Sequence, residues 1–335
     1  MRLARIICGG LAALLFAAAA GTAAEAASPG VTGQPPVMLV AFGSTAPETR
    51  QTFARIDEDV KRAFPDRTVV WAFTSQLIRE RLKEQGDVLP DPQEALDALA
   101  SNGFHEVVLQ SLHVMPGEEY QALFSLNPHG MKLLVGAPLL SDARDMNEIQ
   151  AMLGGLCRTD RPNVVAAHGN SKRPQLNAPL VDLAARLESN RTDVILATIE
   201  GPPGTRSFAR IQGLVARTNA VHFIPLMLAS GVHVRDDLLG DGKESWKQLL
   251  KADDVSVSPA LGDLPEARAL VIRHIREAHP IGKRTEALMS ASGRTGMSAY
   301  SLWKMHLPFW PRKVTIFLEL ALIIIAGVLI GQVLE

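Results

Sequence analysis

Residues 164–170 read Val-Val-Ala-Ala-His-Gly-Asn, a short apolar run that ends in a histidine and a glycine. A run of this kind, stopped by glycine, is typical of a buried strand in a parallel sheet. Residues 194–201 read Val-Ile-Leu-Ala-Thr-Ile-Glu-Gly, a second run of the same type. A third run, residues 221–228, leads into the turn Ser-Gly-Val-His at 230–233. The pattern predicts three strands, each with a polar side chain at or just after its end.

Those polar residues are His168, Glu200 and His233, at intervals of 32 and 33 residues. Each interval is about the length of one strand–helix unit in a parallel sheet. Parallel strands end at the same edge of a sheet, where ligands usually bind, so we expect the three side chains to meet in one cleft. Two imidazoles and a carboxylate bind a borderline divalent metal and can also accept protons. The sequence therefore predicts a metal site with proton-transfer chemistry.

The middle of the chain alternates strand and helix patterns. Strands are expected at 37–42, 68–73, 106–111 and 132–136, and helices at 47–64, 76–85 and 91–101. The second half repeats this order, with the run that ends at His168 mirroring the run that ends at Gly43. Such alternation predicts an α/β fold of two similar halves, whose parallel sheets face a central cleft. The expected bounds are 36–155 for the N-terminal half and 160–282 for the C-terminal half.

The N-terminus has the pattern of a secretory signal peptide over residues 1–26. A basic start is followed by an apolar stretch at 6–20 and by small residues around Ala24-Glu25-Ala26 that fit a cleavage site. An uncleaved anchor is the alternative. Cleavage would remove Cys8 and leave Cys157 as the mature chain's one cysteine, which excludes an intrachain disulfide.

The C-terminus predicts a transmembrane helix at 314–334. Its 21 residues, at about 1.5 Å each, would span ~32 Å, enough for the hydrocarbon core of a bilayer. A linker and interfacial segment, 283–312, precedes it and contains Trp303 and Trp310. A buried helix of a soluble core is the alternative. Together with the signal peptide, the helix predicts a periplasmic body anchored to the inner membrane.

The glycines at 327 and 331 are four residues apart on this expected helix, a spacing that lets two helices approach closely. We therefore expect a homo-oligomer or a membrane transporter as a partner, with a passive anchor as the alternative. Other classes of function lack their signals. The net charge of -1 gives no indication of nucleic-acid binding. Glycine-rich loops of the P-loop or Rossmann type are absent, which argues against a nucleotide cofactor.

Several segments give the chain a family resemblance between about residues 37 and 278. The most specific are Gln110-Ser111-Leu112-His113 and the string Asp241-Gly-Lys-Glu-Ser-Trp-Lys. The chain resembles the sirohydrochlorin cobaltochelatases of the anaerobic cobalamin pathway. That resemblance implies two flavodoxin-like halves, no nucleotide, and a metal bound by two histidines and a glutamate between them. These would be His168, Glu200 and His233, which would also carry the catalysis.

The resemblance also implies a reaction, the insertion of Co²⁺ as substrate metal into a carboxylate-rich tetrapyrrole such as sirohydrochlorin. A non-catalytic, membrane-tethered carrier of metal or tetrapyrrole is one alternative, and a chelatase for Fe²⁺ or Ni²⁺ is another, because ligand type alone does not separate these ions. The chain departs from the family pattern at Val232, where an acid is expected, and at the basic pair Lys172-Arg173.

Further residues are candidates for contact with the tetrapyrrole. His113 lies at the matching strand end of the first half, and Ser44 and Ser111 carry hydroxyls near strand ends. Basic side chains could hold the substrate's carboxylates through charge-assisted hydrogen bonds. The candidates for that role are Arg206, Arg210, Arg235 and the pair Lys172-Arg173.

Overall fold

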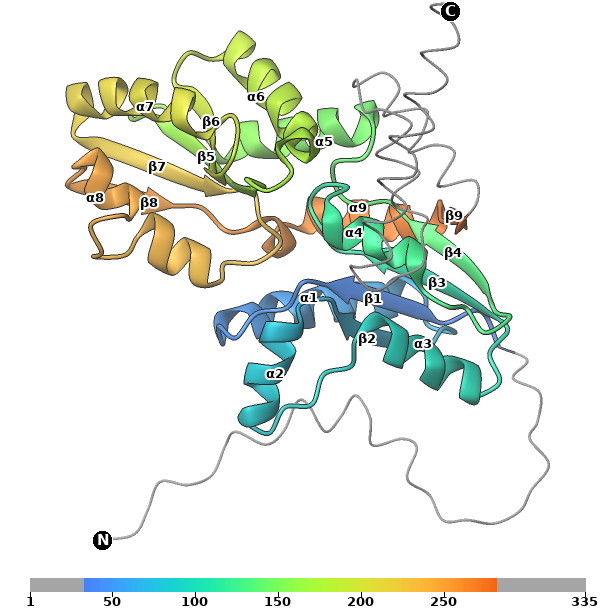
Figure 1. Ribbon diagram of the computed structural model, residues 1–335. Helices are drawn as coiled ribbons and strands as arrows, with labels where there is room; N and C mark the ends of the chain where they lie inside the picture. The colour runs from blue at the N-terminus through green and yellow to red at the C-terminus, as the bar shows by residue number, and fades with distance from the viewer. Residues whose placement is uncertain (1–32, 282–335) are drawn as a thin grey trace, which may run out of the picture. The chain divides into compact units, whose positions relative to one another are not determined.

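A computed structural model of the chain describes residues 33–281, except for the side chains of Thr205 and Arg206. These residues form two sheets with the same internal order of strands (Figure 1). The first, β2-β1-β3-β4-β9, contains β1 (Val37–Ala41), β2 (Val69–Phe73), β3 (Glu106–Ser111), β4 (Lys132–Gly136) and β9 (His279–Pro280). The second, β6-β5-β7-β8, contains β5 (Asn163–Gly169), β6 (Val194–Glu200), β7 (Ala220–Pro225) and β8 (Asp254–Val257). All pairings are parallel except that of β9, which confirms the predicted α/β class.

The helices connect these strands as the alternating pattern predicts. Those that precede β5 are α1 (Glu48–Ala63), α2 (Gln76–Glu84), α3 (Pro92–Ser101), α4 (Glu118–Ala122), η2 (Leu123–Ser125) and α5 (Ala143–Leu156). Those that follow it are η3 (Pro174–Asn177), α6 (Ala178–Asn190), α7 (Gly204–Thr218), η4 (His233–Leu238), α8 (Trp246–Leu250), η5 (Leu261–Asp263) and α9 (Pro265–Arg276). Local signals define the helix starts. Asp91, for example, forms a capping box with Glu94 ahead of α3.

The core is divided by the faces of the strands. In β1, Val37 and Leu39 point into one layer, whereas Met38 and Val40 point into another, as side chains along a strand alternate. The first layer is continuous through both halves and is covered by α1, α5, α6 and α9. The outer layers are separate: α3 and α4 cover the first sheet, and α7, η4 and α8 the second. The shared layer holds the two halves together.

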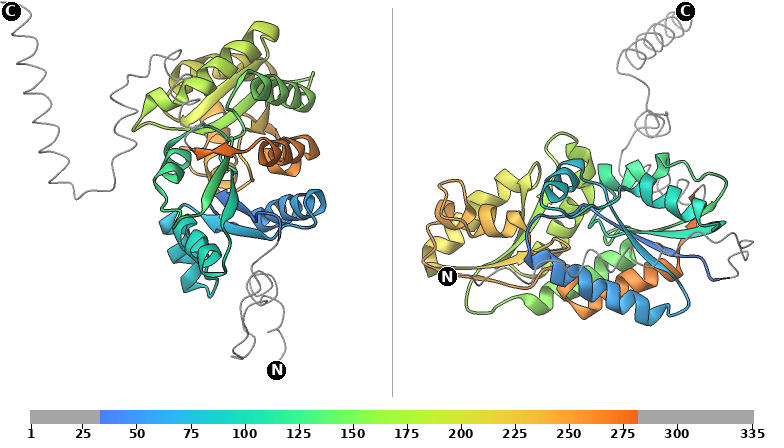
Figure 2. Two further views of the ribbon diagram at one scale, coloured as in Figure 1. Left: turned by 90° about the vertical axis from the view of Figure 1, so that its right-hand side faces the viewer. Right: turned by 90° about the horizontal axis from the view of Figure 1, so that it is seen from below.

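The last part of the expected second half lies on the first sheet. Helix α9 packs on β3 and β4 and lies beside α1 (Figure 2), and β9 adds a strand next to β4. Polar contacts fix this crossing: Arg268 Nε donates to Asp59 Oδ2 at 2.6 Å, and Thr52 Oγ1 donates to Asp263 Oδ1 at 2.8 Å. An amphipathic pattern along the chain indicates a helix but not the sheet it covers, so the sequence could not predict this placement.

Within residues 33–281, no helix is long and apolar enough to cross a membrane. The expected signal peptide at 1–26, the linker at 283–312 and the expected transmembrane helix at 314–334 lie outside the described residues.

Candidate metal site

The structure brings together the two histidines that the strand ends predict. The ring centroids of His168 and His233 are 4.6 Å apart, with an angle of 77° between the ring planes. His168 lies in the last part of β5, exposed between buried neighbours, and His233 begins η4, a π-helical turn. Short π-helical segments occur frequently at functional sites. The two imidazoles therefore form a pair at the carboxyl edge of the second sheet.

In each of these rings, Nδ1 lies within hydrogen-bond distance of an oxygen that can only accept a hydrogen bond. His168 Nδ1 lies 2.9 Å from the carbonyl oxygen of Gly169. His233 Nδ1 lies 2.7 Å from Asp237 Oδ2. A neutral ring must then carry its proton on Nδ1, which leaves the lone pair on Nε2 open. Two such nitrogens are suitable donors to a divalent metal ion.

Glu200 stands at the end of β6, next to β5, but its carboxylate is held by the loop after His168. Ser171 Oγ donates to Glu200 Oε2 at 2.9 Å, and the Ser171 N–H does so at 3.5 Å. The Ser171 hydroxyl bond keeps the pKa of Glu200 below its usual value against the effect of burial, with smaller contributions from His168 and Lys172. Glu200 is therefore ionised at neutral pH.

No group of three or more His, Cys, Asp or Glu side chains within 33–281 is arranged to hold a metal ion. The structure thus joins His168 and His233 but leaves Glu200 bonded to Ser171. The backbone itself brings the two loops into contact, because a Cβ on Gly169 would lie 2.0 Å from the carbonyl oxygen of Glu200. Glycine is required there, with φ at +76°.

Sequence reasoning missed Asn177, which ties these loops together. Its side chain is fully buried, and Nδ2 lies 2.8 Å from Pro202 O and 3.2 Å from Asn170 O. One residue therefore spans the loops that follow His168 and Glu200. An isolated asparagine before a helix carries no local signal of this role, because its partners come from two different connections.

The first-half candidates form a hydrogen-bonded group. His113 Nδ1 lies 2.9 Å from Ser111 Oγ, and Nε2 lies 3.5 Å from Thr74 Oγ1. Burial lowers the pKa of His113 to about 4, so this imidazole is neutral at neutral pH. Ser111 is fully buried, and its hydroxyl is hydrogen-bonded to the His113 ring. Ser44 lies against the turn that leads to His233, since a Cβ on Gly231 would be 3.2 Å from Ser44 Oγ.

The candidate basic anchors fall in different places. Arg210 pairs with Glu188 and donates to the carbonyl of Thr192, just before β6, which puts it at the opposite end of that strand from Glu200. Arg173 Nε pairs with Glu118 Oε1 at 2.9 Å and so connects the two halves beside the His168 loop. The side chain of Arg206 lies outside the described residues.

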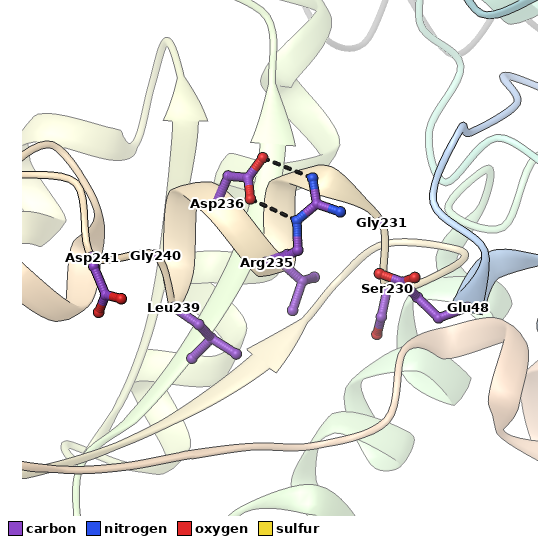
Figure 3. A pocket seen from close by; sticks show the side chains of 9 residues that line it. Glu48, Ser230, Gly231, Arg235, Asp236, Leu239, Gly240 and Asp241 are labelled. Carbon is purple, nitrogen blue, oxygen red and sulfur yellow. Dashed lines mark hydrogen bonds and ion pairs between the residues drawn. The ribbon is translucent and has the colours of Figure 1, made fainter. Parts of the chain in front are cut away.

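Arg235 lies in a cavity of about 550 Å³ between the start of α1 and η4 (Figure 3). Its guanidinium is paired with Asp236, through Nε at 2.7 Å and Nη2 at 3.0 Å. Glu48 and Asp241 also line the cavity, so three carboxylates accompany one cation. His168, Glu200 and His233 are not among the lining residues, which makes this a separate space next to the histidine pair. Its charge does not favour a carboxylate-rich ligand.

Comparison with known proteins identifies the family. Residues 36–280 match the family model described as "Cobalt chelatase (CbiK)". The chain belongs to this cobalt chelatase family. As a member of the cobalt chelatases it is a metal chelatase, and the match runs from the residue before β1 to the end of β9, so the crossing segment α9–β9 is part of the family domain.

Two curated relatives of the cobalt chelatase domain are similar along most of their length. The "Sirohydrochlorin cobaltochelatase" of Salmonella typhimurium is 28% identical over 258 residues, which cover 72% of this chain and 95% of the relative. The "Sirohydrochlorin cobaltochelatase CbiKC" of Nitratidesulfovibrio vulgaris is 30% identical over 249 residues, 70% of this chain and 86% of the relative. A solved structure, "SirB from Bacillus subtilis with Fe3+", has a similar fold, with a TM-score of 0.50 at 16% identity, over 73% of this chain and 95% of that one.

Proposed function

We propose that this protein is a sirohydrochlorin cobaltochelatase, which inserts Co²⁺ into a carboxylate-rich tetrapyrrole in cobalamin biosynthesis without a nucleotide. The observation that carries the proposal is the pair of imidazoles, 4.6 Å apart, at the carboxyl edge of a sheet inside a cobalt chelatase domain. Two curated relatives with 28% and 30% identity bear this name. The geometry supports metal binding, and the family supports the identity of the metal.

In this proposal His168 and His233 hold Co²⁺, as a substrate, through their open Nε2 atoms. Glu200 is the third ligand, and it exchanges its bond to Ser171 for the ion. Its ionised carboxylate then offsets part of the positive charge. This movement of the carboxylate breaks its hydrogen bonds from the Ser171 hydroxyl at 2.9 Å and the Ser171 N–H at 3.5 Å, and a hydrogen bond to a charged group typically contributes roughly 1.5–3 kcal/mol. The exchange is therefore small against the attraction of a divalent ion.

Metal insertion requires two pyrrole N–H protons to leave the ring. As Co²⁺ passes from the imidazoles to the ring nitrogens, each released Nε2 lone pair becomes free to accept a proton. Imidazole is suited to that exchange near neutral pH. His168 and His233 thus deliver the ion and receive the protons, and charge balances because two protons replace one divalent ion at the protein.

The substrate's carboxylates need cations near the site, and Lys172 and Arg173 lie in the loop that follows His168. Arg173 holds the Glu118 carboxylate at 2.9 Å, the type of pairing that a substrate carboxylate would also make. We propose that a carboxylate of the ring takes the place of Glu118. Arg235 is less suited, because Asp236 already occupies its guanidinium.

The function is tested with purified protein, Co²⁺ and sirohydrochlorin, by following the visible spectrum of the macrocycle. Multiple turnovers above the uncatalysed rate are expected, with loss of activity in His168→Ala and His233→Ala. His129→Ala is the matched control, because His129 is an exposed imidazole paired with Asp97 at 2.9 Å in the first half. One stoichiometric change without turnover would instead establish a carrier, and faster insertion of Fe²⁺ or Ni²⁺ would reassign the metal.

The location of the domain is a second part of the proposal. The signal-peptide pattern at 1–26 and the apolar segment at 314–334 support a periplasmic domain anchored to the inner membrane. Protease treatment of spheroplasts should then degrade the chelatase domain of a tagged protein in the membrane fraction. Protection from protease in intact spheroplasts would contradict this location and leave the chemistry unaffected.

A further inference from the structure

The acidic residue behind His233 has no role in the ligand set just described. Asp237 lies four residues after His233 on η4, and its Oδ2 is 2.7 Å from His233 Nδ1. Both side chains are about two-fifths exposed, at 41% and 42%. An exposed pair of this kind contributes little to stability, typically about 1 kcal/mol or less. Asp237 nevertheless contacts the imidazole of a proposed metal ligand, at Nδ1, the ring nitrogen opposite the proposed metal-binding Nε2.

The contact determines which nitrogen of His233 can bind a metal. A carboxylate only accepts hydrogen bonds, so a neutral imidazole that faces it through Nδ1 must hold its proton there. Nε2 then carries the lone pair. Without Asp237, the proton could reside on either nitrogen, and the ring could rotate about its side-chain bonds.

His168 meets the same requirement by other means. The acceptor at its Nδ1 is the backbone carbonyl of Gly169, at 2.9 Å. The two rings of the pair therefore have the same proton arrangement, one set by backbone and one by a side chain. Only the second can be removed by a substitution, which makes Asp237 the point at which this arrangement can be tested.

We propose that Asp237 is a positioning residue that fixes the tautomer and the orientation of His233, so that Nε2 is presented to an incoming divalent cation. The inference rests on the proposed role of His168 and His233 as metal ligands. A carboxylate behind a ligating imidazole also strengthens the ring as a donor, and the loss of such a partner typically lowers metal affinity about 10–100-fold. Asp237 does not itself touch the ion in this arrangement.

The experiment combines metal titration with detection of the tautomer in the full-length protein. In wild-type protein labelled with ¹⁵N-histidine, long-range ¹H–¹⁵N spectra without metal should show His233 protonated on Nδ1. Asp237→Ala should shift His233 toward the Nε2-protonated form and reduce Co²⁺ affinity about 10–100-fold. Asp237→Asn keeps an accepting oxygen without the charge, so its affinity should fall between the two.

The matched control is Asp97→Ala, which removes the carboxylate from another exposed aspartate–histidine pair, that with His129 at 2.9 Å. It should leave Co²⁺ affinity unchanged. Asp237→Ala and Asp237→Asn that both fold and bind Co²⁺ as tightly as the wild type would overturn the proposal, provided that His233→Ala loses binding. If His233→Ala also keeps full affinity, the ligand assignment itself fails, so the two failures are distinguishable.

Discussion

The two halves of the chelatase domain share a strand order, and they differ at the carboxyl ends of those strands. Val40 and Ala166 occupy the same position, because each accepts a 2.8 Å bond from the residue after the third strand of its own sheet. Two residues further on, Phe42 in the first half corresponds to His168 in the second. A glycine with positive φ follows both, at +100° and +76°. The backbone is alike and the side chains are not.

The same register extends the comparison to the neighbouring strands. Glu200 corresponds to Ser75, which caps α2 by accepting from the Ile78 N–H at 3.4 Å. In the order of elements, η4 follows β7 as α4 follows β3, and His233 is the first residue of η4 as Glu118 is of α4. The first-half residues form a helix cap and an ion pair, whereas those of the second half are the proposed metal ligands. A duplicated scaffold thus provides two equivalent edges, and only one of them carries the predicted metal chemistry.

The largest effect is expected when the equivalent residues His168 and Phe42 are each replaced by alanine. His168→Ala should lower Co²⁺ affinity by more than the roughly 10–100-fold that loss of an outer partner costs, because it removes a ligand. Phe42→Ala should bind Co²⁺ like the wild type, since its position offers no donor atom. Calorimetric titration of both variants measures the difference. Equal losses would show that the edge of the second sheet is not the metal site.

A second comparison is between a buried ion cluster at α9 and the exposed ion pair Arg173–Glu118 beside the His168 loop. Asp145 is fully buried and accepts from Arg273 at 2.8 Å, His274 at 2.9 Å and Ser141 at 2.8 Å. Burial alone would raise the pKa of Asp145, but these bonds outweigh it and bring the pKa to about 2. Asp145→Asn should therefore lower the free energy of unfolding by about 3–5 kcal/mol, as measured by urea denaturation.

The pH dependence of stability checks the same cluster. Because the folded-state pKa of Asp145 is below its unfolded value, its contribution is complete above about pH 4 and disappears as the pH falls toward 2. The difference in stability between the wild type and Asp145→Asn should shrink over that interval. A difference that stays constant from pH 5 to pH 2 would contradict the ionised, hydrogen-bonded carboxylate.

His113 provides a pH effect of the same direction at higher pH. Burial lowers its pKa from 6.5 to about 4, so between these values the unfolded chain binds a proton that the folded chain does not. Stability should fall as the pH drops from 6.5 to 4, by at most about 3.5 kcal/mol, because one pKa unit corresponds to about 1.4 kcal/mol. His113→Asn should remove this slope. If the free energy of unfolding of the wild type and of His113→Asn changes equally with pH over this range, the effect is excluded.

The smallest effect is expected at the exposed pair that joins the halves, Arg173–Glu118. Loss of this pair should cost about 1 kcal/mol of stability or less, since exposed ion pairs are screened by solvent. Its effect should appear in substrate binding: Arg173→Ala should raise KM for sirohydrochlorin, whereas Glu118→Gln should lower it by releasing the guanidinium. Steady-state kinetics at two ionic strengths measure both. Equal increases of KM in the two variants would mean that the pair serves only to hold the halves together.

Much of this protein is determined locally. The apolar run before His168, the glycine after it and the capping box of α3 predict strand and helix bounds to within a residue or two, because each depends on neighbours in the chain. The sequence by itself also placed His168 and Glu200 at the ends of neighbouring strands and His233 in the turn after a third, since parallel strands end at one edge. The structure shows the histidine pair. The full triad remains a prediction.

Only the tertiary structure decided which partners these residues have. Asp145 and His274 are far apart in the chain, and α9 crosses to the first sheet, where no periodic pattern could place it. The carboxylate of Glu200 is bonded to Ser171, and Arg210 lies at the opposite end of β6 from the expected site. The free nitrogen of His233 depends on Asp237. A sequence pattern specifies the backbone path, whereas hydrogen-bond partners and side-chain directions depend on packing between segments that meet only in the folded chain.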